Sequence, residues 1–180
     1  MPPVPHFRRA AFACAALTLA ACSPTFNWRE VPVGDDGLVA LLPCKPDRAS
    51  RRLPLGSDAV AVDMAGCEAG GATFAVAHAR ADSAAQAESW LRAWQAATRQ
   101  QLTAAPWTET AANLPRAALA PAPARLATTA PAGDRQAAHL QVLWFAEQRP
   151  GGWALYQATV LGAPSSAEAP KTFFEGLRLP

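Results

Sequence analysis

The pair Gly70-Gly71 lies between two long runs of small and apolar residues, and no other feature of the sequence constrains the fold as strongly. Adjacent glycines favour the two-residue turns that join antiparallel strands, because glycine adopts a positive φ at little cost. Residues 59–69 and 72–80 are therefore predicted to form a hairpin with the two glycines as its loop. Both faces of this hairpin are mostly apolar, which predicts a sheet that is covered on both sides.

The rest of the chain predicts an α+β fold with a mostly antiparallel sheet of about seven strands, one long helix inserted mid-chain and a short C-terminal helix. Proline interrupts several runs and limits where strands can pair. The further strands are expected at 27–33, 38–42, 49–55, 139–147 and 153–161, and 125–130 is another candidate. Together they form a single domain over residues 27–180.

Asp82 or Ser83 is predicted to cap the long helix, which runs to about Leu102. Trp90 and Trp94 belong to its apolar stripe, and we interpret them as core packing rather than a ligand platform. The complete stripe is Ala87, Trp90, Leu91, Trp94, Ala97 and Leu102.

An Ala/Pro-rich loop is expected at about 103–124, after the long helix. Ser165 or Ser166 is the expected cap of the C-terminal helix, in which Pro170 is tolerable only in the first turns.

The N-terminus has the order of an export signal. Arg8 and Arg9 precede an apolar run at 10–21, which spans about 18 Å as a helix and is too short for a hydrocarbon core of roughly 30 Å. The run Leu19-Ala20-Ala21-Cys22 resembles the lipobox of bacterial lipoproteins. The resemblance implies a signal peptide at 1–21, cleavage before Cys22, and attachment of a diacylglycerol and an acyl chain such as palmitate to that residue.

A lipidated tether at 22–26 would then hold the domain on the periplasmic side of the membrane. By the usual sorting rule of lipoproteins, Ser23 favours the outer membrane. The alternative is a secreted protein in which Cys22 is a plain thiol.

Once residues 1–21 are removed, two of the 16 Lys and Arg residues are lost, and 14 basic residues face 14 acidic ones. Nucleic-acid binding therefore lacks its electrostatic signature.

Cys44 and Cys67 remain in an oxidising compartment, where a disulfide would stabilise the fold by ~3 kcal/mol. Two buried thiols, or a metal pair with His78, are the alternatives. No metal or cofactor site is expected, since neither cysteine belongs to a ligand cluster.

Catalytic signatures such as G-x-S-x-G or H-E-x-x-H do not occur in the sequence. In the predicted hairpin Asp63 faces His78, and with Ser50 or Ser57 this pair would form the machinery of an envelope hydrolase. A simple cross-strand polar pair is the alternative that we favour.

Trp107, in the Pro-rich loop, and Trp153, beside two glycines, are candidate binding anchors unless they fold back onto the sheet.

The stretches "GLVALLPCKP", "GCEAGGATFAVAHA" and "KTFFEGLRLP" resemble small bacterial lipoproteins of uncharacterised function. Their layout is similar to the PsbP-like α/β sandwich, a fold that implies assembly factors and binding proteins rather than one chemistry. The expected function is therefore a non-catalytic binding or envelope-assembly module, with an envelope protein or a small apolar ligand as its partner.

Overall fold

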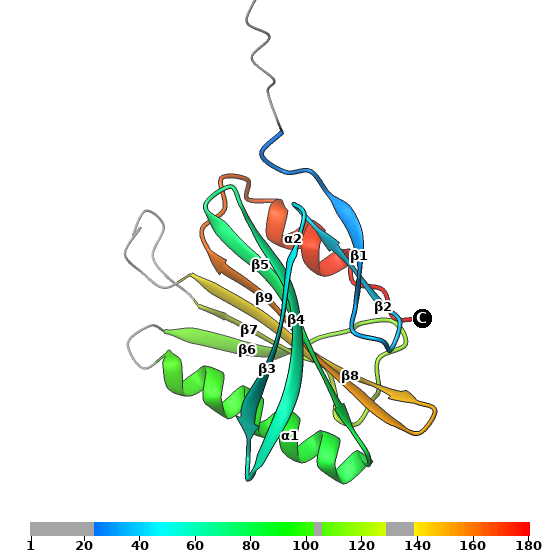
Figure 1. Cartoon of the computed structure of the whole chain (residues 1–180). Helices are drawn as coiled ribbons and strands as arrows, with labels where there is room; N and C mark the ends of the chain where they lie inside the picture. The colour runs from blue at the N-terminus through cyan, green and yellow to red at the C-terminus, as the bar shows by residue number, and fades with distance from the viewer. Residues whose placement is uncertain (1–23, 103–105, 129–138) are drawn as a thin grey trace, which may run out of the picture.

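The computed structural model describes residues 24–102, 106–128 and 139–180, so the predicted signal peptide and Cys22 lie outside the described residues. Its centre is a seven-stranded sheet in the order β3-β4-β5-β9-β8-β7-β6, in which every neighbouring pair is antiparallel (Figure 1). A separate hairpin, β1-β2, and two helices pack on this sheet. The predicted α+β class is confirmed.

The strands of the large sheet are β3 (Asp47–Leu55), β4 (Asp58–Ala69), β5 (Ala72–Ala81), β6 (Trp107–Ala111), β7 (Ala124–Thr128), β8 (Leu140–Arg149) and β9 (Gly152–Gly162). The remaining elements are β1 (Arg29–Val33), β2 (Leu38–Leu42), α1 (Ala84–Gln101) and α2 (Ala169–Glu175).

The hairpin around the twin glycines forms in the predicted register. Gly70 and Gly71 have φ values of 60° and 85°, the left-handed conformation that a type I′ turn requires at both central positions. Asp63 lies opposite His78 along the paired strands. The hairpin prediction is therefore confirmed at the level of individual residues.

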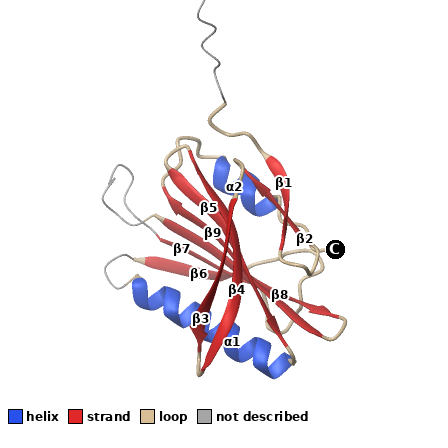
Figure 2. Ribbon diagram, in the orientation of Figure 1, coloured by secondary structure: helices blue, strands red, loops and turns tan. Residues whose placement is uncertain are grey.

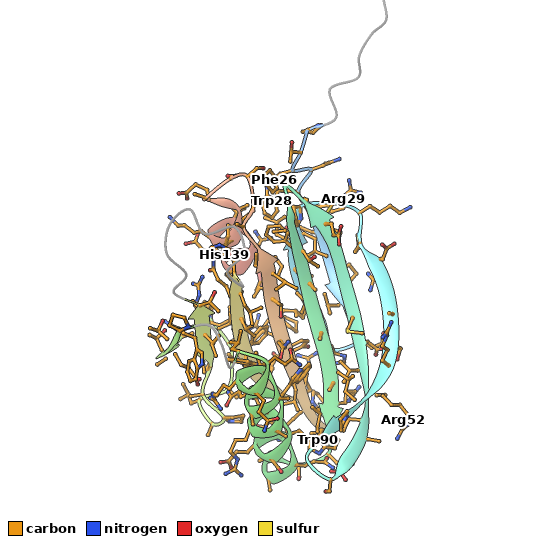
Figure 3. The ribbon with its side chains drawn as sticks, turned by 90° about the vertical axis from the view of Figure 1, so that its left-hand side faces the viewer. Phe26, Trp28, Arg29, Arg52, Trp90 and His139 are labelled. Carbon is orange, nitrogen blue, oxygen red and sulfur yellow. A yellow bond between two sulfur atoms is a disulfide. The ribbon has the colours of Figure 1, made fainter. Side chains whose placement is uncertain are left out.

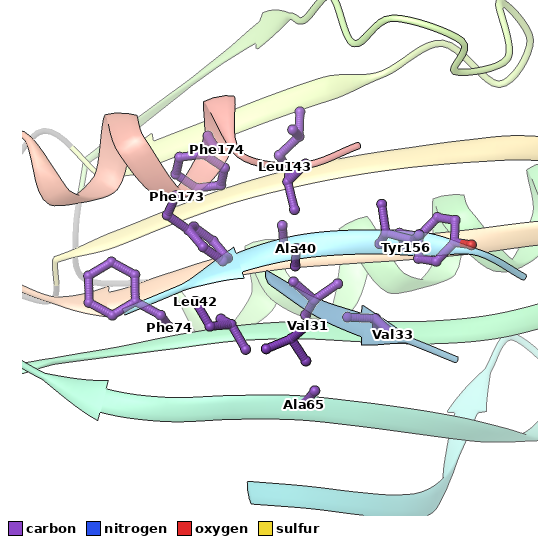
Figure 4. Packing of buried hydrophobic residues seen from close by; sticks show 14 of the residues in the cluster. Val31, Val33, Ala40, Leu42, Ala65, Phe74, Leu143, Tyr156, Phe173 and Phe174 are labelled. Atoms are coloured by element: carbon purple, nitrogen blue, oxygen red, sulfur yellow. The ribbon is translucent and has the colours of Figure 1, made fainter. Parts of the chain in front are cut away.

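The sheet is covered on both faces, as its apolar pattern predicts. On one face α1 packs over Val60 and Val62 of β4 and Leu155 of β9. On the other face the β1-β2 hairpin and α2 enclose a larger core around Phe74 and Tyr156 (Figures 2 and 4). Two covering layers allow the central strands to be apolar on both sides.

Helix α1 begins at the predicted cap, because the Ser83 hydroxyl accepts a hydrogen bond from the Gln86 backbone N–H. Trp90 and Trp94 are buried against the sheet, which confirms their assignment to the core. Ala97 was predicted in the same stripe but is exposed, and Thr98 is buried in its place. The Thr98 hydroxyl donates to the Trp94 carbonyl oxygen, so the helix itself satisfies this buried hydroxyl.

Two segment predictions were wrong. The expected loop at 103–124 contains strand β6 and reaches the first residue of β7; β6 escaped detection because all its residues are exposed and show no apolar alternation. Helix α2 begins at Ala169, with Glu168 as N-cap and no side-chain cap from Ser165 or Ser166. This later start keeps Pro170 in the first turn, where its missing N–H costs nothing.

A disulfide links Cys44, just after β2, to Cys67 in β4, with a Cα–Cα distance of 5.9 Å. The predicted bridge is therefore present and ties the β1-β2 layer to the large sheet. Among the described residues, no helix is long and apolar enough to cross a membrane.

We expect the Cys44→Ala/Cys67→Ala double variant to lower the free energy of unfolding by about 3 kcal/mol, because its unfolded chain is no longer constrained by the bridge. Urea denaturation would measure the difference. The reduced wild type provides the control and should unfold at the same urea concentration as the double variant. If the double variant had the same midpoint as the oxidised wild type, the bridge would not be stabilising.

Candidate functional site

The imidazole of His78 has a different carboxylate partner from the one predicted. His78 Nε2 lies 2.7 Å from Asp36 Oδ2, and both side chains are at least 95% buried. Asp63 faces His78 in the backbone register, but its side chain is exposed and makes no hydrogen bond to His78. The pair expected at this position is thus replaced by Asp36–His78, and Asp36 comes from the turn between β1 and β2.

Local backbone geometry brings this turn onto β5. Gly34 has a φ of 63°, and its Cα packs so closely on His78 that a Cβ there would overlap Nδ1 of the ring. Only glycine meets both conditions without strain. The second carboxylate oxygen of Asp36 lies 3.3 Å from Arg80 Nη1, so this single carboxylate ties the turn to two residues of β5.

The buried polar groups continue from β5 across β9 to β8. Tyr156 is fully buried, and its ring lies 5.1 Å from that of His78 and 5.0 Å from that of Phe145. Burial raises the pKa of the Tyr156 hydroxyl, and the charges of Asp36 and Glu147 raise it further. Burial also raises the pKa of Glu147, against the opposing effect of Arg149 and Arg116.

Four buried polar atoms in this region have no hydrogen-bond partner among the described residues: His78 Nδ1, Tyr156 OH, Glu147 Oε2 and Arg149 Nε. Because such atoms are rare and costly in folded proteins, their concentration on β5, β9 and β8 marks a polar seam inside an apolar layer. The described residues contain no cluster of three metal-ligating side chains, and no hydroxyl or thiol among them is bonded to His78.

A cleft of about 620 Å³ opens beside this seam. Pairing between β4 and β5 stops at Asp63–His78, although β4 begins five residues earlier, at Asp58, and β5 continues to Ala81. The strands spread apart beyond that point, with α1 behind them (Figure 1). Ser57 lines the cleft, as do Asp63 and His78, whereas Ser50 lies opposite Asp63 on β3 outside it. The residues proposed for a hydrolase, Asp63, His78 and a serine, thus lie near one another but are not joined by hydrogen bonds.

The two candidate tryptophan anchors lie apart. Trp107 is 38% exposed on the edge strand β6 and aligns with Thr128. Trp153 is half-buried against the α1 face and pairs with Gln148. Since β7 meets β8 near Gln141, the two indoles lie near opposite ends of β8, roughly 20 Å or more along the strand. Trp153 folds back onto the sheet, and only Trp107 is exposed as an anchor requires.

Figure 3 shows Trp90 and Arg52 at the far end of the domain from Phe26 and Trp28.

A larger groove of about 740 Å³ lies beside α2, on the face that β1-β2 also covers. The segment 110–116, the end of α2 and the C-terminal tail line it. Its floor is apolar and consists of Leu114, Leu143, Phe174, Leu177 and Leu179. Figure 4 shows Phe173 turned toward Phe74 in the core and Phe174 on the side of Leu143.

Charged side chains surround this apolar floor. The Arg125 guanidinium lies 4.5 Å above the centre of the Phe174 ring and donates to Gln141 Oε1 at 2.7 Å. Arg116 has a φ of 70°, an uncommon conformation for a residue with a side chain and one that concentrates at functional sites. The groove has the volume and the mixture of apolar floor and few polar groups that small-molecule sites have.

Sequence reasoning missed both the groove and Asp36. Arg116, Arg125 and Phe174 come from three distant segments, and nothing local predicts that they meet. The paired phenylalanines of "KTFFEG" gave one signal, since adjacent residues of a helix point in different directions, and Phe173 and Phe174 reach different parts of the same core.

No protein-family model matches the chain, and no curated protein is similar to it in sequence.

Asp36→Ala should lower the free energy of unfolding by about 1–3 kcal/mol, because it leaves His78 Nε2 buried without its partner. Asp63→Ala is the matched control and should change it by less than about 0.5 kcal/mol, as an exposed substitution does. Urea denaturation of both variants tests the assignment. A larger loss in the Asp63 variant would contradict the assignment of Asp36 as the stabilising partner of His78.

Proposed function

We propose that this protein is a lipid-anchored, non-catalytic binding module of the bacterial cell envelope, attached through Cys22 and facing the periplasm from the outer membrane. The observation that carries the binding function is the groove beside α2. Its apolar floor is accessible to a ligand of the size that fills small-molecule sites. The ligand that we propose is a small apolar molecule of the envelope.

Two observations support the compartment. The lipobox-like run ending at Cys22 follows a short apolar segment with basic residues before it, and the Cys44–Cys67 bridge is of the kind that forms in oxidising compartments. An acyl anchor of two or three chains holds a protein firmly, at ~0.8 kcal/mol per buried CH₂.

The first residues of the domain set how far it can stand from its anchor. Phe26 packs against the core, with its ring 6.0 Å from Trp28 and 6.5 Å from Phe74, and the Asn27 N–H donates to the Pro43 carbonyl oxygen. Only Ser23, Pro24 and Thr25 separate Phe26 from Cys22, a reach of at most about 14 Å. The end of the domain that carries Phe26 would therefore stay close to the lipid headgroups.

The surroundings of His78 do not favour hydrolysis. Asp36 occupies Nε2, and Gly34 packs against Nδ1, so neither ring nitrogen is placed to take a proton from a substrate or a nucleophile. The His78/Asp63 hydrolase is therefore the weaker alternative. The polar seam instead holds the β1-β2 layer in place.

Cys22→Ser should move the protein from the membrane fraction to the soluble fraction of a bacterial host, because the anchor needs the thiol. Cys14→Ser is the matched control, since Cys14 would leave with the signal peptide, and it should stay in the membrane fraction. Globomycin, which blocks cleavage of prolipoproteins, should leave a larger species of the wild type on a gel. A wild-type protein that is found in the soluble fraction and keeps its size on a gel under globomycin would contradict the lipid anchor.

The neutral apolar dye N-phenyl-1-naphthylamine should bind one site per chain with increased fluorescence. Ala112→Trp places an indole in the groove and should weaken this binding at least tenfold. Ala85→Trp, on the exposed side of α1, should leave it unchanged. Equal binding by both variants would place the dye elsewhere and contradict a binding function for the groove.

A further inference from the structure

The groove beside α2 combines its apolar floor with an excess of positive charge. Four cationic side chains line it, Arg116, Arg125, Lys171 and Arg178, against the single carboxylate of Glu175. The whole mature chain, in contrast, has equal numbers of basic and acidic residues. The cations are therefore concentrated at this site rather than spread evenly over the surface.

Three of the four cations line the groove without an ion pair among the described residues. Arg178 is bound to Glu30, outside the groove. Lys171 has no ion pair among the described residues. Among the described residues, Arg125 makes one side-chain hydrogen bond, to the neutral Gln141. Arg116 acts on Glu147 only through its charge, and Arg149 is the residue in ion-pair contact with that carboxylate.

Arg125 joins the two halves of the site. Its guanidinium covers the face of Phe174, which is itself part of the apolar floor, and Arg125 also belongs to the lining of the groove. A planar guanidinium presents paired donors that match the two oxygens of a carboxylate. An anionic group at this point would lie beside Phe174, and a chain attached to it could extend over the other residues of the apolar floor.

We infer that the ligand of this groove is a free single-chain amphiphile with an anionic head group, of the long-chain carboxylate class. The inference rests on the proposed binding function and adds the chemistry of the ligand. The head group lies against Arg125, with Arg116 and Lys171 adding positive charge around it, and the alkyl chain covers the apolar floor. A neutral amphiphile would fill the floor but gain nothing from these cations, and a cationic one would be repelled by them.

Three probes with the same twelve-carbon chain separate the head group from the chain: dodecanoate, dodecyl maltoside and dodecyltrimethylammonium. Each is titrated into the full mature domain, with Cys22→Ser, below its micelle-forming concentration, and its dissociation constant is measured by displacement of N-phenyl-1-naphthylamine. Dodecanoate should bind at least tenfold more tightly than either of the other two, a difference of 1.4 kcal/mol.

Arg125→Gln should weaken dodecanoate binding about tenfold and leave dodecyl maltoside unchanged, because only the charged contact is lost. Lys171→Gln, at an exposed position, gives a second variant with a smaller loss and no effect on the core. Arg92→Gln is the matched control, because Arg92 is an exposed arginine on α1, across the sheet from the groove. This variant should bind all three probes as the wild type does.

The outcomes distinguish the two proposals. Equal dissociation constants for the three head groups, or equal losses for anionic and neutral probes in Arg125→Gln, would overturn the anionic ligand while groove binding stands. Failure of all three probes and of the dye to bind would overturn the binding function itself.

Discussion

The docking of the β1-β2 hairpin onto the large sheet is the interaction on which the rest of this structure depends. Without it α2, the segment around Leu114 and the C-terminal tail would cover only part of the face that carries Phe74 and Tyr156, and apolar residues of β5 and β9 would meet water. The contacts that hold the hairpin include its buried apolar side chains, the Cys44–Cys67 bridge and the Asp36–His78 pair. The apolar contacts supply most of the free energy, and the bridge and the polar contacts fix the position.

The sequence predicts those parts of the fold whose signals are local. The twin glycines define both the turn and the register of β4 with β5, and the Ser83 cap and tryptophan stripe define α1. The disulfide follows from elimination among the cysteines. Strand β6 gives no such signal, because an exposed edge strand has no buried face to alternate. The change from Ala97 to Thr98 in the α1 stripe has a similar cause: a threonine that bonds its own helix can be buried as readily as an alanine.

The site residues are harder to predict, since their partners are distant in sequence. For a histidine in a strand, the hairpin register predicts which residue lies opposite it on the neighbouring strand. For His78 that residue is Asp63. It does not show what packs above the sheet, and Asp36 approaches from that direction. The groove beside α2 illustrates the same difficulty: each of its residues looks ordinary in its own segment, and only the crossing of the 110–116 segment over the sheet, next to α2, places cations around an apolar floor.

The position of the disulfide also determines how the domain would respond to mechanical load. A pull on the chain at Phe26 passes through β1 and β2 to Cys44, and there the bridge carries part of it directly to Cys67 in β4. Residues 45–66 lie inside the covalent ring, and the bridge keeps them from being stretched beyond the span that it allows. Strand β3 is an edge strand that would otherwise be the first to peel away, and it is shielded. The load reaches the sheet through β4, whose neighbours on both sides are hydrogen-bonded to it.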